Sequence, residues 1–329
     1  MQKRDNTLKI TVVGCGRWGS CIAWYLDNSV GHDVTLYGRE NSPHYAAFLK
    51  DRTNGLVTLP ESIALLCDLE EALRRSDTIV LSIGAQSLRS FMREASRYPL
   101  ENKDFVLCIK GIEIESGKLL HEVMAEFLPP SCRVAVWVGP GHVQEFVKGH
   151  PNCMVIDSAD RDFTKYLADS FSGGIIRFYY GSDLVGTEVG SAAKNVIGIA
   201  AGILDGLNCS SLKGALMSRS VVETARLIRK MGGNPASAFG LSMLGDFEAT
   251  VFSPYSHNRT FGECFAAGKP YKELAEGYFT AKALHSLCRQ YEVEMPICDA
   301  VYRVLYENAD VKSAMEGLFS RSRKEEFNF

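Results

Sequence analysis

A lysine within a long apolar segment is the first residue of this sequence that could carry chemistry. The segment Thr187–Leu204 has helical spacing, with apolar side chains on one face and Ser191, Lys194 and Asn195 on the other. Lysine can accept a proton when burial or a second cation lowers its pKa. A lone lysine on a helix is usually solvated, but a polar cluster on an apolar helix favours a site between packed elements.

A glycine-rich turn near the N-terminus could bind phosphate. It fits the pattern G-x-G-x-x-G, directly after a short apolar strand and at the start of a helix. In that context Gly14 permits a tight turn, Gly16 lets a pyrophosphate approach the backbone, and Gly19 lets helix and strand pack closely. Backbone N–H groups and the helix dipole then face the phosphates, next to Arg17 and Trp18. The pattern predicts a dinucleotide site, with a turn of no function as the alternative.

The end of the predicted second strand bears on the choice between NAD and NADP. An acid there binds the ribose hydroxyls of NAD, whereas an arginine can accept the 2′-phosphate of NADP. Arg39 and Glu40 are adjacent in this sequence, so both signals are present. Because Arg39 comes first and Gly38 leaves room, we weakly favour NADP over NAD. A merely solvated Arg39 is the alternative.

The elements that must position these residues follow two patterns. In the first half, short β-rich runs alternate with helical patterns, which predicts βαβ units and a largely parallel sheet. The predicted strands are Leu8–Val13, Asp33–Tyr37, Thr78–Ser82, Phe105–Ile109 and Arg133–Val138, separated by predicted helices at Gly19–Asn28, Ser42–Lys50, Gln86–Ser96 and Lys118–Leu128. After a last strand signal at Ile175–Tyr180, nearly everything has a helical pattern. We therefore expect an α/β protein with a Rossmann-type domain (residues 1–183) and an all-helical substrate domain (residues 184–329).

Composition excludes several classes of function. Hydrophobic residues make up 46% of the 329 residues and the formal net charge is −3, which gives no electrostatic reason to expect nucleic acid or an anionic membrane as partner. No uncharged apolar run approaches the ~20 residues of a membrane span, and the polar start does not resemble a signal peptide. None of the ten cysteines forms a C-x-x-C pair, so we expect free thiols in a reducing cytoplasm and no metal site.

Four motifs together resemble those of the bacterial NAD(P)-dependent glycerol-3-phosphate dehydrogenase family. The first motif is the glycine loop at Gly14–Gly19. The four motifs occur in the family's order, and together they span nearly the whole chain. The other three are Cys108–Glu113, Gly190–Gly202, and Leu244–Asp246 followed by Ser256–Gly262. The resemblance implies a homodimer that interconverts dihydroxyacetone phosphate and sn-glycerol 3-phosphate by hydride transfer with NAD(P)H. It also implies a role in supplying glycerophospholipid synthesis.

The resemblance assigns roles to the polar residues. The lysine matching Lys194 is the proton acceptor, and the one matching Lys110 lies near both cofactor and substrate. Lys110 would add positive charge, which favours a phosphorylated substrate and lowers the proton affinity of Lys194. Asp246 could orient Lys194 or bind a substrate hydroxyl, with a helix cap as the alternative. Thr250, one helical turn later, points the same way as Asp246.

A polar cluster after Pro254 is the candidate phosphate site. A helix that begins there would present free N–H groups to a phosphate. The candidate substrate contacts are Lys110, Gly139, Lys194, Asn195, Asp246, Thr250, Ser256, His257, Asn258 and Arg259, and the further candidate cofactor contacts are Lys110, Val143, His257 and Glu276. An ordinary polar turn is the alternative for the cluster.

Two positions depart from the family's pattern. His257 replaces an arginine that contacts phosphate and cofactor, and histidine is not bidentate. Arg259 could compensate for that loss. Gly141 replaces a serine that lies near the substrate. These changes bear on substrate affinity and identity.

Two other functions stay open at this point. A 3-hydroxyacid or 2-ketopantoate type reductase has the same architecture, but a carboxylate substrate would not need the phosphate-like cluster. A non-catalytic NAD(P)-sensing protein would bind cofactor without turnover, although it could lose the lysines and the aspartate freely.

Overall fold

The computed structural model describes residues 7–326, so the first residues of the polar start lie outside the described part. The chain forms two compact units. Of the described residues, the first comprises 7–109 and 120–182, and the second comprises 110–119 and 183–326. Residues 110–119, which fall inside the range expected for the first domain, are thus grouped with the second unit.

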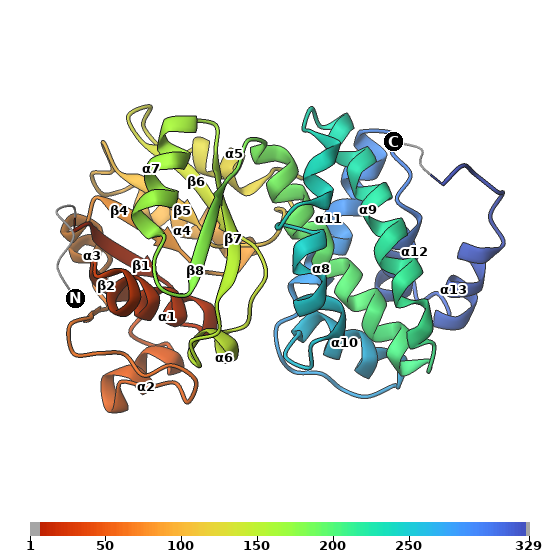
Figure 1. Cartoon of the computed structure of the whole chain (residues 1–329), viewed down its shortest axis with the longest axis horizontal. Helices are drawn as coiled ribbons and strands as arrows, with labels where there is room; N and C mark the ends of the chain where they lie inside the picture. The colour runs from red at the N-terminus through yellow and green to blue at the C-terminus, as the bar shows by residue number, and fades with distance from the viewer. Residues whose placement is uncertain (1–6, 327–329) are drawn as a thin grey trace. The chain divides into compact units, whose positions relative to one another are not determined.

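An eight-stranded sheet forms the centre of the first unit (Figure 1). Its order is β3-β2-β1-β4-β5-β6-β7-β8, and all neighbours are parallel except β6 and β7. The strands are β1 (Lys9–Val13), β2 (Asp33–Tyr37), β3 (Ala64–Leu66), β4 (Thr78–Leu81), β5 (Asp104–Leu107), β6 (Arg133–Val138), β7 (Asn152–Ser158) and β8 (Ile176–Tyr180). The largely parallel sheet is confirmed, and β3 and β7 are strands that the sequence did not reveal.

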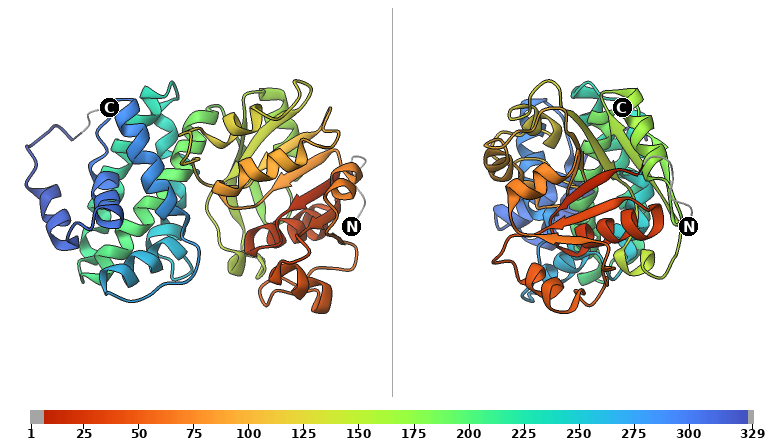
Figure 2. Two further views of the ribbon diagram at one scale, coloured as in Figure 1. Left: turned by 180° about the vertical axis from the view of Figure 1, so that it is seen from behind. Right: turned by 90° about the vertical axis from the view of Figure 1, so that its left-hand side faces the viewer.

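Helices cover both faces of this sheet. In Figure 1, α1 lies on the face toward the viewer, and Figure 2 shows α4 on the opposite face. The helices are α1 (Arg17–Trp24), α2 (Pro43–Asp51), α3 (Leu69–Arg75), α4 (Leu88–Ala95), α5 (Leu120–Ala125), α6 (Val143–Phe146) and α7 (Arg161–Phe171). The predicted helix Gly19–Asn28 begins earlier, at Arg17, and continues as a π-helix over Tyr25–Val30.

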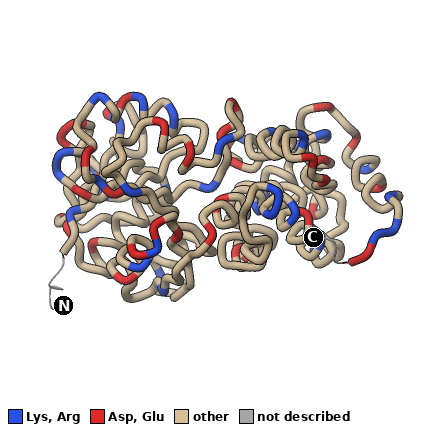
Figure 3. Tube along the Cα trace, turned by 90° about the horizontal axis from the view of Figure 1, so that it is seen from above, with Lys and Arg blue, Asp and Glu red and all other residues tan. Residues whose placement is uncertain are grey.

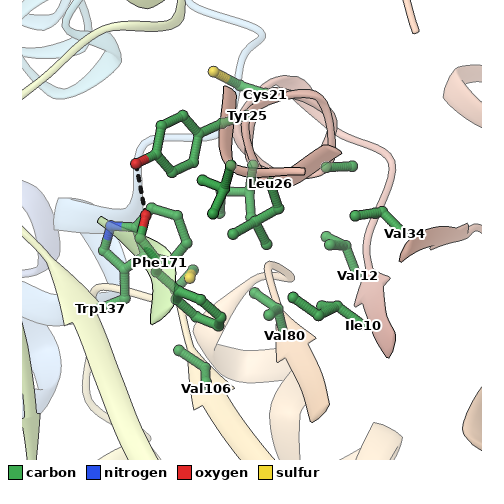
Figure 4. Packing of buried hydrophobic residues seen from close by; sticks show 14 of the residues in the cluster. Ile10, Val12, Cys21, Tyr25, Leu26, Val34, Val80, Val106, Trp137 and Phe171 are labelled. Atoms are coloured by element: carbon green, nitrogen blue, oxygen red, sulfur yellow. Dashed lines mark hydrogen bonds between the residues drawn. The ribbon is translucent and has the colours of Figure 1, made fainter. Parts of the chain in front are cut away.

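The core of the first unit joins the sheet to α1. Figure 4 shows Ile10, Val12 and Val80 of the sheet facing Leu26. The Tyr25 hydroxyl donates a hydrogen bond to the carbonyl of Phe171 at 2.7 Å, so the polar tip of this buried ring has a partner. This packing holds the π-helical turn that follows α1 against the sheet.

The second unit is helical, as expected. Its α-helices are α8 (Leu184–Gly206), α9 (Lys213–Lys230), α10 (His257–Ala266), α11 (Glu276–Gln290), α12 (Pro296–Tyr306) and α13 (Val311–Phe319). Every residue of α8 from Gly186 to Leu204 is buried, which makes this helix the centre of the unit. Gly232, just beyond the end of α9, has a φ of +87°, a left-handed conformation that suits glycine. The α/β fold with an all-helical second part is confirmed.

Helix α10 packs on α8 almost backbone to backbone. A Cβ placed on Gly202 would lie 1.9 Å from the carbonyl oxygen of Arg259, and one on Gly262 would lie 2.1 Å from that of Ile199. Only glycine fits at these two contacts. The polar stripe of α8 therefore lies directly beneath the segment that contains α10.

Charged residues are interspersed along the chain. Figure 3 shows Lys and Arg positions alternating with Asp and Glu over the trace. Within residues 7–326, no helix is both long and apolar enough to cross a membrane. In the same part of the chain, no group of three or more His, Cys, Asp or Glu side chains is arranged to hold a metal ion.

Candidate active site

The three glycines of the loop in the first unit are each required for a different structural reason. Gly14 has a φ of +112°, and a Cβ there would lie 2.2 Å from the carbonyl oxygen of Ser82. A Cβ on Gly19 would lie 1.9 Å from the carbonyl oxygen of Gly14. Gly16, the N-cap of α1, has no atom within 4 Å of its Cβ position. The backbone at Gly16 is thus open to a ligand, and a phosphate there would face the N–H groups of α1.

The other predicted residues of the first unit lie on several elements. Arg17 is the first residue of α1, and the Trp18 ring lies 5.9 Å from that of Phe146. Val143 begins α6 and is buried. Gly139 has a φ of +143° and follows directly after β6, so its conformation also favours glycine.

The space at Gly38 differs from the expectation. A Cβ there would lie 2.7 Å from the Tyr45 ring and 2.8 Å from the Cys15 sulfur. Gly38 therefore permits close packing against Tyr45 and Cys15 and leaves no room for a 2′-phosphate. The prediction that it leaves such room, given as one reason to favour NADP, is wrong. Arg39 and Glu40 are both exposed.

Gly141 also has a physical reason. Its φ is +142°, and a Cβ there would lie 2.3 Å from the Phe146 ring. A serine would be strained and would collide with that ring. Glycine in place of the family's serine is therefore explained by the close packing of Gly141 against Phe146 of α6.

Two lysines share one carboxylate in the second unit. The Oδ2 atom of Asp246 lies 2.8 Å from Nζ of Lys194 and 2.7 Å from Nζ of Lys110. Lys194 also donates a hydrogen bond to the Thr250 hydroxyl at 2.8 Å. The side chain of Asp246 is 2% exposed, that of Lys194 9% and that of Lys110 23%. The structure thus brings together four predicted residues, and the two lysines hold Asp246 where the sequence also allowed a helix cap.

The electrostatics of this cluster favour a lysine that can release its proton. Burial lowers the pKa of Lys194 to about 8; Asp246 opposes this shift and Lys110 adds to it. Two cations and one carboxylate leave the cluster with one net positive charge when both lysines are protonated. Such a cluster can exchange a proton near neutral pH and attract an anion.

Two asparagines link this cluster to the neighbouring helices. Asn195 donates from Nδ2 to the carbonyl of Lys110 at 3.4 Å and accepts from Nδ2 of Asn258 at 3.1 Å. The Asn258 Oδ1 atom accepts from the backbone N–H of Gly277 at 2.9 Å. Glu276, a predicted cofactor contact, is the first residue of α11 and precedes this N–H. The amides therefore tie α8, α10 and α11 together beside the lysines.

The predicted phosphate cluster forms the start of α10. Ser256 is the N-cap, and its hydroxyl accepts from the backbone N–H of Arg259 at 3.3 Å. Nδ1 of His257 lies 2.7 Å from the Tyr271 hydroxyl. The guanidinium of Arg259 instead pairs with Asp205 at 2.6 Å and Glu263 at 3.1 Å. The expectation that Arg259 compensates for the missing arginine is therefore not supported, because its Nη1 and Nε donors already bind protein atoms.

A large cavity lies elsewhere in the second unit. It has a volume of about 1070 Å³ and is lined by residues of α8, α9, α12 and α13, such as Ile203, Leu216, Val304 and Met315. Its lining does not include Lys194. This cavity and the lysine cluster therefore lie at different places in the second unit.

Sequence reasoning missed three residues around this site. Asp205 binds Arg259 of the predicted cluster and Tyr271 binds His257, while Lys213 binds Asp205 and the carbonyl of Val251. One signal was available for Asp205, because it lies eleven residues after Lys194 and hence on the same side of a helix. Nothing in the sequence marked Lys213 or Tyr271.

Family comparisons cover nearly the whole chain. Residues 9–164 match the family described as NAD-dependent glycerol-3-phosphate dehydrogenase N-terminus, and residues 183–316 match its C-terminus. A protein of Chlorobium phaeobacteroides named glycerol-3-phosphate dehydrogenase (NAD(P)+) is 36% identical over 97% of this chain and 99% of its own length. A protein of the same name from Bacillus mycoides is 37% identical, over 97% of both chains.

Solved structures agree with these relatives. A crystal structure of glycerol-3-phosphate dehydrogenase from Coxiella burnetii has a TM-score of 0.89 and 28% identity, and the match covers 96% of this chain and 99% of that one. A ketopantoate reductase from Ralstonia eutropha has a TM-score of 0.61 at 13% identity, with 94% and 99% covered. The second likeness shows the fold alone.

Proposed function

This chain belongs to the NAD-dependent glycerol-3-phosphate dehydrogenase family, and on that premise we propose that Lys194 is the general acid and base of its reaction. The enzyme is an oxidoreductase that interconverts dihydroxyacetone phosphate and sn-glycerol 3-phosphate with NAD(P)H. The observation that carries the assignment is the buried Lys194 ammonium held between Asp246 and Thr250. A lysine with a pKa of about 8 can both donate and accept a proton near neutral pH.

The residues of the first unit fit a dinucleotide. The open Cβ position at Gly16 and the start of α1 would hold the pyrophosphate, beside Arg17 and Trp18, and Arg39 would reach the ribose end. We further propose Val143, His257 and Glu276 as cofactor contacts, on the family resemblance. When bound, the nicotinamide supplies or accepts the hydride.

The lysine cluster performs the proton chemistry. In reduction, protonated Lys194 donates a hydrogen bond to the substrate carbonyl oxygen and then gives its proton to the forming alkoxide. In oxidation, neutral Lys194 takes the hydroxyl proton. Asp246 holds the Lys194 ammonium in place, and Lys110 keeps the Lys194 pKa low. The ion pairs of Lys194 and Lys110 with Asp246, at 2.8 and 2.7 Å, support these roles.

The substrate's phosphate would bind near the start of α10. The N-cap Ser256, His257 and Asn258 lie there, and Lys110 adds positive charge to the site as a whole. Gly139, Asn195 and Thr250 complete the proposed substrate contacts. The phosphorylated three-carbon substrate follows from family membership and is supported by the net positive charge of the cluster.

Family membership also supports three broader proposals. We expect a homodimer in the cytoplasm that supplies glycerol 3-phosphate for glycerophospholipid synthesis. Analytical ultracentrifugation at several concentrations tests the dimer: a sedimentation mass of one chain throughout contradicts it.

Turnover measurements test the proposed function directly. Purified enzyme is mixed with dihydroxyacetone phosphate, and the near-ultraviolet loss of NADPH and then of NADH is followed. Lys194→Met is compared with Lys230→Met, which removes an exposed lysine of α9. Turnover that is lost only in Lys194→Met supports the assignment. Cofactor binding without turnover by the wild-type enzyme contradicts the proposed function. Keto-acid substrates would then be tested, and a sensing role would be considered if those substrates also failed.

A further inference from the structure

A second charged cluster lies at the C-terminal end of α8. The Oδ2 atom of Asp205 accepts hydrogen bonds from Lys213 at 2.7 Å and from Arg259 at 2.6 Å, and its Oδ1 atom accepts one from Ser210 at 2.7 Å. The exposed fractions are 13% for Asp205, 8% for Lys213 and 16% for Arg259. Burial opposes ionisation of Asp205, but the bonds from Lys213, Ser210 and Arg259 outweigh it and lower the pKa. We call Asp205, Lys213 and Arg259 the Asp205 clip.

Each cation of the clip also binds a backbone carbonyl. Lys213 donates to the carbonyl of Val251 at 3.0 Å, and Nε of Arg259 donates to that of Ser253 at 3.1 Å. Both carbonyls belong to the segment 250–256. That segment begins with Thr250, the partner of Lys194, and ends with the N-cap of α10. The clip therefore binds the segment that carries a contact of the proposed acid–base lysine.

The same stripe of α8 joins the clip to the lysine. Lys194 and Asp205 are eleven residues apart, about three helical turns, and so lie on the same side of α8. Between them, a Cβ on Gly198 would lie 2.9 Å from Cγ2 of Thr250. Thr250 thus packs on this stripe, and a shift of segment 250–256 along α8 would move its hydroxyl away from Lys194.

We propose that Asp205 is a positioning residue for the reaction: through Lys213 and Arg259 it holds segment 250–256 on α8, so that Thr250 and the start of α10 stay in register with Lys194. The inference rests on the proposed function of Lys194. Apart from Arg259, whose guanidinium it holds, Asp205 has no side-chain hydrogen bond or ion pair with a candidate substrate or cofactor residue in the described part of the chain, and it acts through two cations. Without its carboxylate these cations would remain buried with one acceptor fewer, which favours their movement toward solvent.

The experiment compares Asp205→Asn with Glu263→Gln. The second variant removes the exposed, alternative acid of Arg259 and leaves the clip intact. We expect Asp205→Asn to lower kcat/KM for dihydroxyacetone phosphate by on the order of 100-fold, because a displacement of about 1 Å costs that much. The KM for NAD(P)H should rise by about fivefold at most, because the glycine loop lies in the other unit and His257 is the proposed cofactor contact at the start of α10. Asp205→Glu should recover most of the loss, and Glu263→Gln should match the wild type.

A second readout does not depend on turnover. Amide hydrogen exchange of residues 248–259 should rise about tenfold in Asp205→Asn, while exchange in the middle of α9 stays unchanged. The double variant Asp205→Asn with Lys213→Met also removes the Lys213 ammonium, which Asp205→Asn leaves without its carboxylate partner. It replaces the single variant in both measurements if the single variant folds poorly. It should show the same rise and no further kinetic loss, because both changes act on one unit.

The outcomes separate the two proposals. Unchanged exchange in segment 248–259 overturns the clip, and so does raised exchange with wild-type kinetics. A uniform loss of active enzyme with KM unchanged indicates a general role in folding and also overturns it. If the wild-type enzyme does not turn over dihydroxyacetone phosphate at all, the proposed function fails, and this is seen before any variant is compared.

Discussion

The glycine loop of the first unit lies within consecutive residues of the chain, whereas the lysine cluster of the second unit joins side chains up to 136 positions apart. The loop depends on missing side chains: Gly14 and Gly19 let backbone atoms approach, and Gly16 leaves space. The lysine cluster depends on the charges that Lys110 and Asp246 place around Lys194. Changes to the loop should therefore act through sterics, and changes to the cluster through the protonation of one amine.

Removal of the amine should have the largest effect. In Lys194→Met we expect kcat to fall about 1000-fold, the scale of general acid–base catalysis, because no other predicted base lies beside the substrate. Cofactor affinity, measured by quenching of protein fluorescence with NADH, should stay within twofold. If Lys194→Met keeps more than a tenth of the wild-type kcat, the lysine cluster does not act through the protonation of the Lys194 amine.

Filling the space at Gly16 should separate binding from stability. Gly16→Val places its side chain in open space, so Tm should change by less than about 2 °C while the KM for NAD(P)H rises about 100-fold. Gly19→Val meets the Gly14 carbonyl and should lower Tm strongly. Differential scanning calorimetry and cofactor titration check both variants. Equal loss of stability in the two variants would show that Gly16 also has a packing role.

The two charges around Lys194 should shift the pH profile in opposite directions. Oxidation of glycerol 3-phosphate needs neutral Lys194, so kcat/KM should rise with pH to a midpoint of about 8, and reduction should decline above that pH. Lys110→Met removes a cation and should raise the midpoint by about one unit, whereas Asp246→Asn should lower it by a similar amount. The profile of kcat/KM against pH measures this, and a shift of the same sign in both variants is the contrary result.

The exposed end of β2 should have the smallest effect. Arg39→Ala should raise the KM for NADPH about fivefold and leave that for NADH unchanged, because only the 2′-phosphate would use the guanidinium. Glu40→Gln is the matched control at the neighbouring exposed position. Equal KM changes for both cofactors in Arg39→Ala would assign no selectivity to this residue.

The same contrast explains what could be predicted from the sequence. The parallel strands and the glycine loop are local patterns, so their ranges agree with the structure to within a few residues. β3 has three half-buried residues, and β7 carries polar residues such as Asn152 and Asp157, so neither shows the apolar run of a buried strand. The contacts of Arg259 with Asp205 depend on how α8, α9 and α10 pack, which no local pattern records. The polar cluster on an apolar helix marked Lys194, resemblance to the family supplied Lys110 and Asp246, and only the structure supplied the distances between them.

The path of the backbone at residues 110–119 limits how this enzyme can be divided or recombined. Lys110 belongs to the helical unit, although 63 residues of the other unit (120–182) intervene before the helical unit resumes at Asp183. A fragment that starts at Asp183 would therefore carry Lys194 and Asp246 without their second cation. A chimera that exchanges the cofactor-binding unit with that of a relative needs three junctions, after residues 109, 119 and 182, to keep the lysine pair from one parent.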